Sequence, residues 1–220
     1  MATAVVPPGS FATQVLSAGI PESITEALDW LRRSEVVALP TDTVYGLVVP
    51  MDDDAAVERL YKAKGRPREM ALPLLLGTLD DVEAVCRDVP AAAWRLAERF
   101  WPGGLTLVLL KQPAVPDRVT GGRPSVAVRL PNHPVPREVA SRLGRPLASS
   151  SANRSGSAAP VTAAQVRAQL DGRIPVILDG GPCAQAHAST IVDLTAAEPI
   201  LLRAGPIPPE EIAAVLHQKL

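Results

Sequence analysis

Apolar residues recur along the whole chain in two patterns that alternate from one segment to the next. Short β-branched runs are typical of buried strands, whereas apolar residues spaced three and four apart predict amphipathic helices. Strands are predicted at residues 36–40, 44–49, 72–76, 105–110, 125–130, 146–149, 176–178, 190–194 and 200–202. Helices are predicted at residues 23–33, 52–62, 79–86, 91–100 and 135–143, and from residues 162 and 208 onward. Because the two kinds of element interleave, we predict an α/β protein with a mixed or partly parallel sheet.

Three of the predicted helix starts carry capping signals. Ser23 with Glu26, and Thr162 with Gln165, have the spacing of a capping box. Residues 52–54 are consecutive aspartates, and acidic groups are favourable at the positive end of a helix dipole. We therefore interpret the aspartates as a helix cap rather than as metal ligands.

No repeat and no linker divides the chain, so we predict one domain over residues 16–220, preceded by a tail over residues 1–15. The chain has 220 residues, of which 47% are hydrophobic, and this is enough to bury a substantial core. No apolar stretch approaches the ~20 residues that a membrane helix needs. Cys86 and Cys183 belong to no CxxC or Cys/His spacing, which is typical of reduced thiols in a cytoplasmic protein.

Several classes of function are disfavoured by the composition and by missing motifs. The formal net charge of −1 argues against a protein that coats nucleic acid electrostatically. The chain has no Walker A, GxGxxG or GxSxG motif, and its three histidines lack metal-ligand spacing, so no protein metal site is predicted. We therefore expect chemistry by positioning and charge neutralisation rather than by a covalent nucleophile.

Cationic side chains follow a predicted helix at Lys64 and Arg66. Two such residues in a loop are able to face one anion, and the arginine fork matches phosphate or carboxylate. Taken alone, the pair more often marks a solvated helix C-terminus, where the dipole favours cations. The loop over residues 149–156 offers Ser151, Asn153 and free backbone N–H groups to phosphate oxygens or adenine edges, or it forms an ordinary polar turn.

An arginine on a predicted buried strand calls for an anionic partner. Ser125 and Arg129 share one face of the strand at residues 125–130, because side chains alternate along a strand. The partner of Arg129 is either a structural carboxylate or the carboxylate of a ligand. Ser189 at the start of another strand and Arg203 at the end of the last one are further candidates.

Taken together, these segments resemble the YrdC/Sua5 family of threonylcarbamoyl-AMP synthases over about residues 25–212. The resemblance rests on the order of seven motifs rather than on any one of them. They are PTDTVYGL at 40–47, KGRP at 64–67, WPGGLTLVL at 101–109, SVAVRLPNHP at 125–134, SSANRSG at 150–156, STIVDL at 189–194 and LRAG at 202–205.

The resemblance implies a YrdC-like α/β fold, in which a twisted mixed sheet with flanking helices presents a concave, positively charged face to its ligands. It implies a nucleotidyltransferase that makes threonylcarbamoyl-AMP and pyrophosphate from L-threonine, bicarbonate and ATP, with Mg²⁺ accompanying the ATP. Other proteins then transfer the threonylcarbamoyl group to adenosine 37 of tRNA. Weak direct binding of tRNA is a further option, and no membrane is involved.

The resemblance also assigns roles to individual residues. L-Threonine contacts are implied at Thr43, Arg129, Ser151 and Ser189. ATP contacts are implied at Lys64, Arg66, Ser125, Asn153 and Arg203, and Lys64 and Arg66 are the expected catalytic residues. The independent reading of the residues agrees, since arginine suits a carboxylate and the other cations suit phosphates.

Four positions depart from the family pattern, namely Asp42, Met70, Leu75 and Val161, where glutamate, asparagine, histidine and a hydroxyl residue are common. The chain also ends at Leu220, so it resembles the short, single-domain form of the family.

Two alternative functions stay open. One is an RNA-binding module, which the near-neutral charge and the lack of RNP-like aromatic patterns disfavour. The other is a YciO-type paralogue with the same fold and a different activity.

Overall fold

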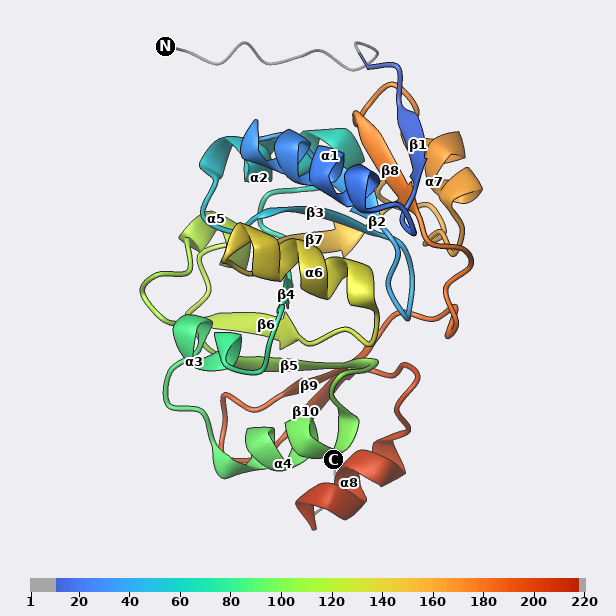
Figure 1. The fold of residues 1–220 in the computed structure, drawn as a ribbon. Coiled ribbons are helices and arrows are strands. Elements are labelled where there is room, and N and C mark those ends of the chain that lie inside the picture. The colour runs from blue at the N-terminus through green and yellow to red at the C-terminus, as the bar shows by residue number, and fades with distance from the viewer. Residues whose placement is uncertain (1–10, 218–220) are drawn as a thin grey trace.

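A computed structural model describes residues 11–217, and within them ten strands form one continuous mixed sheet (Figure 1). The strands are β1 (Gln14–Ser17), β2 (Val37–Leu39), β3 (Gly46–Pro50), β4 (Leu74–Leu75), β5 (Leu105–Leu110), β6 (Ser125–Arg129), β7 (Leu147–Ser151), β8 (Val176–Asp179), β9 (Thr190–Asp193) and β10 (Ile200–Arg203). Their order across the sheet is β1-β8-β2-β3-β7-β4-β6-β5-β9-β10. Several neighbours in this order, such as β3 and β7 or β5 and β9, are far apart in the sequence, so the centre of the sheet unites distant segments.

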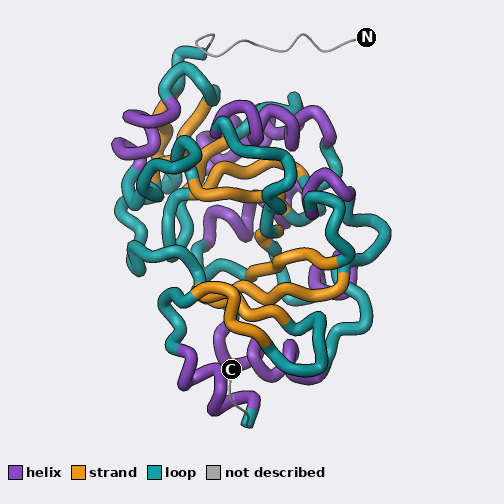
Figure 2. Tube along the Cα trace, turned by 180° about the vertical axis from the view of Figure 1, so that it is seen from behind, coloured by secondary structure: helices purple, strands orange, loops and turns teal. Residues whose placement is uncertain are grey.

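Eight helices lie around this sheet in the described part of the chain. They are α1 (Pro21–Arg32), α2 (Asp54–Lys64), α3 (Asp81–Val85), α4 (Ala91–Phe100), α5 (Asp117–Thr120), α6 (Pro134–Leu143), α7 (Ala163–Leu170) and α8 (Pro209–Leu216). Figure 1 shows α1 and α6 side by side in front of the sheet, and α4 and α8 together at its lower end. Seen from behind, the strands form one stack between the helices at the top and bottom (Figure 2). The α/β class predicted from the interleaved patterns is confirmed.

Alternation along the strands divides the core between the two faces of the sheet. Val37 and Leu39 pack in the cluster beneath α1 and α6, whereas Ala38 between them belongs to the larger cluster on the other side. In the same way, Leu75 packs in the cluster beneath α1 and α6, and Leu74 packs in the larger cluster. Side chains of successive strand residues point to opposite faces, so strands covered on both faces are apolar throughout. These strands read as continuous apolar runs for that reason.

Two of the three predicted helix caps are confirmed. The carboxylate of Asp53 accepts a hydrogen bond from Ala56 N, and the hydroxyl of Thr162 accepts one from Gln165 N. The capping box at Ser23 is wrong, because α1 already begins at Pro21 and Ile20 is its N-cap residue. Proline is favourable in the first turn of a helix, where its missing N–H is not needed, and it moves the helix start upstream of Ser23.

The predicted domain boundary at residue 15 also needs correction. Residues 1–10 of the predicted tail lie outside the described residues, but Gln14 and Val15 belong to β1, which pairs in parallel with β8. The hydroxyl of Thr13 donates to Ile174 O at 2.7 Å and ties the start of this strand to the domain. The side chains of β1 are mostly exposed, so its apolar pattern is weak. The short helix α5 was likewise not predicted.

No helix within residues 11–217 is long and apolar enough to cross a membrane.

Candidate functional site

A pocket of about 130 Å³ lies where the loop between β2 and β3 meets the ends of several strands. Its walls are mostly hydroxyl and small apolar side chains, with two arginines. The lining residues are Thr41, Thr43, Val44, Tyr45, Gly46, Pro73, Leu75, Thr106, Arg129, Ser149, Ser151, Ala159, Ala188, Ser189 and Arg203. The central strands β3, β7, β4, β6, β5 and β9 are consecutive in the sheet, which explains how residues from such distant segments share one pocket.

Arg129 at the end of β6 is the buried cation of this pocket, with only 6% of its surface exposed. Its guanidinium donates from Nε to Gly103 O at 2.8 Å, from Nη1 to Thr43 Oγ1 at 2.6 Å and from Nη2 to Asp42 Oδ1 at 2.5 Å. Burial lowers the pKa of Arg129, and the neighbouring Asp42 carboxylate opposes that shift. Two separate loops therefore hold one planar group in a single orientation, with N–H donors left for a ligand.

Asp42 supplies the negative charge beside Arg129 but does not line the pocket. It is 6% exposed, and its second oxygen Oδ2 has no hydrogen-bond partner among the described residues. The turn that carries it is fixed by Thr41, whose Oγ1 accepts from Thr43 N at 3.1 Å and donates to Val44 O at 2.7 Å. Asp42 thus stands behind Arg129 and orients it toward the pocket.

A chain of hydroxyl groups and one further arginine forms the opposite wall. Ser189 Oγ lies 2.7 Å from Thr106 Oγ1 and accepts a hydrogen bond from Arg203 Nη2 at 3.0 Å. The Nε of Arg203 donates to Ser189 O at 2.8 Å. Burial and the nearby charge of Arg129 both lower the pKa of Arg203. The pocket therefore contains two cations, and among the residues that the structure describes only Arg129 of the two has a carboxylate partner.

Lys64 is the last residue of α2 and is almost completely buried, with 3% of its surface exposed. Its ammonium donates to the backbone oxygen of Ser151, to Asn153 O at 2.6 Å and weakly to Asn153 Oδ1 at 3.5 Å. Burial, with a smaller contribution from Arg66, lowers the pKa of Lys64 to about 8. Direct contact between Lys64 and a phosphate stays a prediction, since the structure directs this side chain to the loop after β7.

Arg66 lies in the loop that follows α2 and folds back on that loop. Its Nη2 donates to Ala71 O at 3.0 Å and its Nε to Met70 O at 3.3 Å. The same carbonyl of Met70 accepts from the hydroxyl of Tyr61 at 3.0 Å. The loop over residues 65–71 is thereby fastened to α2, two residues before Pro73 enters the wall of the pocket.

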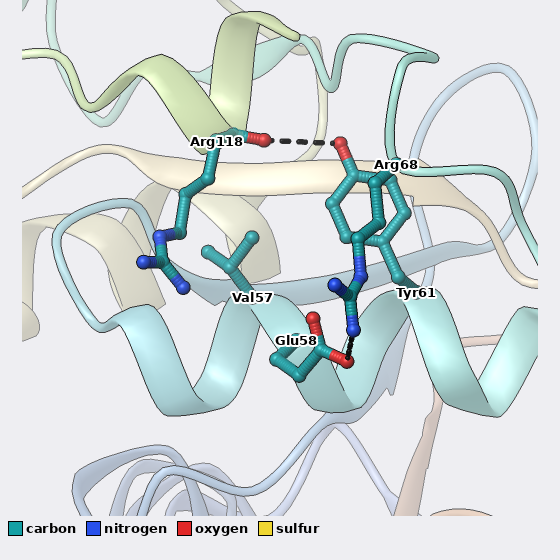
Figure 3. Close-up of a pocket in the computed structure, with 5 residues that line it drawn as sticks. All are labelled: Val57, Glu58, Tyr61, Arg68 and Arg118. Carbon is teal, nitrogen blue, oxygen red and sulfur yellow. Dashed lines mark hydrogen bonds and ion pairs between the residues drawn. The ribbon is translucent and has the colours of Figure 1, made fainter.

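A second pocket, of about 230 Å³, lies against the outer side of α2 and is shown in Figure 3. Tyr61 donates there to Arg118 O at 3.2 Å, and Arg68 pairs with Glu58 at 2.5 Å (Figure 3). Arg118 pairs with Asp54 at 2.7 Å. Both arginines of this pocket already have carboxylate partners, so it serves to join α2, α5 and the loop over residues 65–71.

The structure brings together only part of the set of residues predicted from the sequence. All four predicted L-threonine contacts line the first pocket, together with Arg203 from the predicted ATP set. Asn153 is buried directly behind the pocket, where it contacts Lys64. Ser125 lies at the start of β6, four residues from Arg129 and roughly 13 Å away along the strand. The ATP roles of Ser125, Asn153, Lys64 and Arg66 stay predictions.

Sequence reasoning did not identify Thr106, it included Ser149 only within the polar stretch over residues 149–156, and it noted Asp42 only as a departure from the family pattern. Thr106 reaches Ser189 because β5 and β9 are parallel neighbours, with Thr106 opposite Ile191. Ser149 faces the pocket because β7 pairs with β3, where it lies opposite Val48. The only available signal was the polar residue within each apolar strand, since the sheet order decides which of them meet.

The described residues contain no group of three or more His, Cys, Asp or Glu side chains that could hold a metal ion. The two cysteines, Cys86 and Cys183, are both buried and free. Burial raises the pKa of both thiols, to about 12 for Cys86. Neither thiol is therefore activated as a nucleophile or as a metal ligand.

Comparison with known proteins places this architecture in a family. The profile of the Sua5/YciO/YrdC family, which carries the description telomere recombination, matches residues 29–205. The chain belongs to the Sua5/YciO/YrdC family. Among the relatives, the threonylcarbamoyl-AMP synthase of Pyrococcus abyssi is 42% identical over 192 residues, which are 87% of this chain and 56% of the relative. A putative threonylcarbamoyl-AMP synthase of Mycobacterium tuberculosis is 42% identical over 193 residues, 88% of each chain.

A solved member of the Sua5/YciO/YrdC family shares the fold in detail. The crystal structure of Pyrococcus abyssi Sua5 complexed with L-threonine matches with a TM-score of 0.89 and 40% identity, over 93% of this chain and 61% of that one. The chain thus spans a little over half of the Pyrococcus relative but most of the mycobacterial one. The family predicted from the order of the motifs is confirmed.

Proposed function

We propose that this protein is a threonylcarbamoyl-AMP synthase, which makes threonylcarbamoyl-AMP and pyrophosphate from L-threonine, bicarbonate and ATP. The observation that carries the proposal is the pocket at Arg129, where a buried and oriented guanidinium faces a wall of hydroxyl groups. A guanidinium suits the carboxylate of an amino acid, and hydroxyls suit its side-chain oxygen. The name of the Pyrococcus structure, Sua5 complexed with L-threonine, supports this assignment.

The proposed chemistry needs no covalent enzyme intermediate. The threonine amine combines with bicarbonate and releases water, which gives a carbamate. A carbamate oxygen then attacks the α-phosphorus of ATP, and pyrophosphate leaves. Arg129 holds the amino acid carboxylate, while Arg66 and Arg203, with the buried charge of Lys64, neutralise phosphate charge. In this scheme the protein acts as a nucleotidyltransferase by positioning its substrates.

Mg²⁺ is expected to reach the site with ATP. The described residues hold no cluster of carboxylates or histidines for it, and Mg²⁺ is commonly ligated by substrate phosphates with few protein groups. When bound, it would neutralise charge on the phosphate oxygens. The product would pass to proteins that transfer the threonylcarbamoyl group to adenosine 37 of tRNA in the cytoplasm, with weak direct tRNA binding as a further option.

The test is incubation of the purified chain with ATP, Mg²⁺, bicarbonate and L-threonine, followed by mass detection of threonylcarbamoyl-AMP. The expected result is product that requires all three substrates, with activity in the order threonine, serine, valine. Loss of a methyl group costs roughly 1–3 kcal/mol, and loss of a hydroxyl that the site reads costs more. Threonine and ATP binding without product would favour a YciO-type paralogue. Salt-dependent tRNA binding without turnover would favour an RNA-binding module.

A further inference from the structure

Lys64 has an environment that neither a solvated helix end nor a simple phosphate contact explains. It is less exposed than any other lysine or arginine within residues 11–217. A buried ammonium is costly unless its hydrogens are bonded and its charge is balanced. None of the ion pairs formed by the described residues includes Lys64, so no carboxylate balances this charge. Its N–H groups instead donate to three oxygen atoms near the end of β7.

Those three oxygens belong to Ser151, the last residue of β7, and to Asn153 in the loop that follows it. An ammonium has three donors, and here they reach the backbone oxygens of Ser151 and Asn153 and, more weakly, the side-chain oxygen of Asn153. The backbone of Lys64 also contacts this loop, because Ser155 N donates to Lys64 O at 2.9 Å. The loop therefore wraps around the end of α2, and the buried lysine is its central attachment.

The same loop carries a wall of the pocket. Ser151 lines the pocket, and the amide of Asn153 closes the loop by donating to Arg154 O at 2.9 Å and Ser157 O at 2.7 Å. Residues 154–159 are exposed and add little packing of their own. Without the ammonium, the carbonyl of Asn153 would lose its partner, and that of Ser151 would keep only the N–H of Asn153. Lys64 thus connects the end of α2 to the segment that carries Ser151 into the pocket.

We propose that Lys64 is a positioning residue, which fixes the loop over residues 151–155 so that Ser151 is placed for the amino acid and Asn153 for the nucleotide. The inference rests on the proposed function for the identity of those ligands. It differs from a direct phosphate contact in one measurable respect. If Lys64 only contacted a phosphate, its loss would weaken the binding of ATP alone. If Lys64 fixes the loop, its loss also weakens the binding of L-threonine when no nucleotide is present.

The test compares Lys64→Met with the wild type and with Lys62→Met. Lys62 lies two residues earlier on the same helix and is half exposed, where it pairs with Glu58. Calorimetry with L-threonine and no nucleotide is expected to show a Kd at least about tenfold higher for Lys64→Met, the usual consequence of unpaired buried groups. Lys62→Met is expected to match the wild type. Lys64→Gln keeps two N–H donors, and its Kd for L-threonine is expected to lie between those of Lys64→Met and the wild type.

Hydrogen exchange at the amides of residues 152–157 gives a second readout that needs no ligand. Protection in this loop is expected to fall about tenfold or more in Lys64→Met while the central strands keep theirs, which shows that the variant is folded. Unchanged threonine affinity in a folded Lys64→Met overturns the inference, and so does an unchanged loop in the exchange experiment. Failure of the wild type to bind threonine refutes the proposed function instead, and exchange alone then decides whether Lys64 fixes the loop.

Discussion

Arg129, proposed for the amino acid, and Arg66, one of two arginines proposed for the phosphates, are held in different ways. Arg129 is buried, and its donors reach Gly103, Thr43 and Asp42, which belong to two loops that are far apart in the sequence. Arg66 is half buried, and its donors reach only the carbonyls of its own loop, at Met70 and Ala71. Arg129 is therefore built into the fold, whereas Arg66 lies on a locally folded loop. Changes on the two sides are expected to have different consequences.

The largest effect is expected at the built-in site. Arg129→Ala leaves the Asp42 carboxylate buried and unpaired, and breaking a buried pair in this way costs about 3–5 kcal/mol of unfolding free energy. Urea denaturation measures the loss, and threonine binding should disappear with it. Arg142→Ala is the control, because its ion pair with Glu138 is exposed and worth at most about 1 kcal/mol. A loss for Arg129→Ala no larger than that of the control would contradict a preformed site.

The next effect concerns the buried charge of Lys64 and appears as a dependence on pH. Its pKa falls from 10.5 to about 8 on folding, so between these values the unfolded chain binds more protons than the folded one. The stability of the wild type relative to Lys64→Met should therefore rise by about 3 kcal/mol from pH 8 to pH 10.5. Urea denaturation of both proteins across this range measures the difference. A difference that does not change with pH would mean that Lys64 keeps its ordinary pKa.

A smaller effect is expected on the nucleotide side. Arg66→Ala should weaken ATP binding by about 1.5–3 kcal/mol, the range for a charge-assisted hydrogen bond. Threonine binding without nucleotide should stay as in the wild type, because Arg66 contacts none of the residues around Arg129. Arg68→Ala is the matched control, since Arg68 lies in the same loop but pairs outward with Glu58. If Arg66→Ala lost equal affinity for ATP and for threonine, the Arg66 loop and the pocket at Arg129 would not act separately.

The smallest effect is expected from Tyr61→Phe. The change removes the hydroxyl that donates to Met70 O and leaves the buried ring in place. The same hydroxyl donates to Arg118 O (Figure 3). Since the loop of Arg66 keeps its other attachments, the Kd for ATP should rise only about three- to tenfold, the equivalent of one neutral hydrogen bond. Calorimetry with ATP and, separately, with threonine measures it. A loss of thermal stability with no change in ATP affinity would assign Tyr61 to the fold alone.

The sequence was sufficient to predict the fold class and most elements, because apolar runs and caps such as Asp53 and Thr162 are local signals. It also predicted that Arg129 lies on a buried strand and has an anionic partner. Whether this partner is a structural carboxylate or a ligand was left open. The structure shows Asp42 as the structural partner and leaves donors free toward the pocket. The pairing was out of reach of local reasoning, because it depends on which strands become neighbours.

Two features that sequence reasoning missed have the same physical origin. Residues 14 and 15 of β1 were predicted as tail, although backbone pairing with β8 decides their place. Lys64 was assigned to the phosphates by the family resemblance, and its burial against a loop was not predicted. Its burial arises only when the loop after β7 folds over the end of α2. In both cases a partner more than 80 residues away determines the environment, and local sequence patterns carry no information about it.

The strand order has a consequence for how occupancy of the pocket is coupled to folding. Its walls come from residues as early as Thr41 and as late as Arg203, and β9 joins the sheet beside β5 only after a long stretch of intervening chain. Non-local pairings of this kind form late and slowly. A partly folded chain would therefore have no partial affinity for the amino acid, and a ligand at 100 times its Kd would add about 2.7 kcal/mol to global stability. Cellular substrate concentration would in this way influence how long each molecule survives.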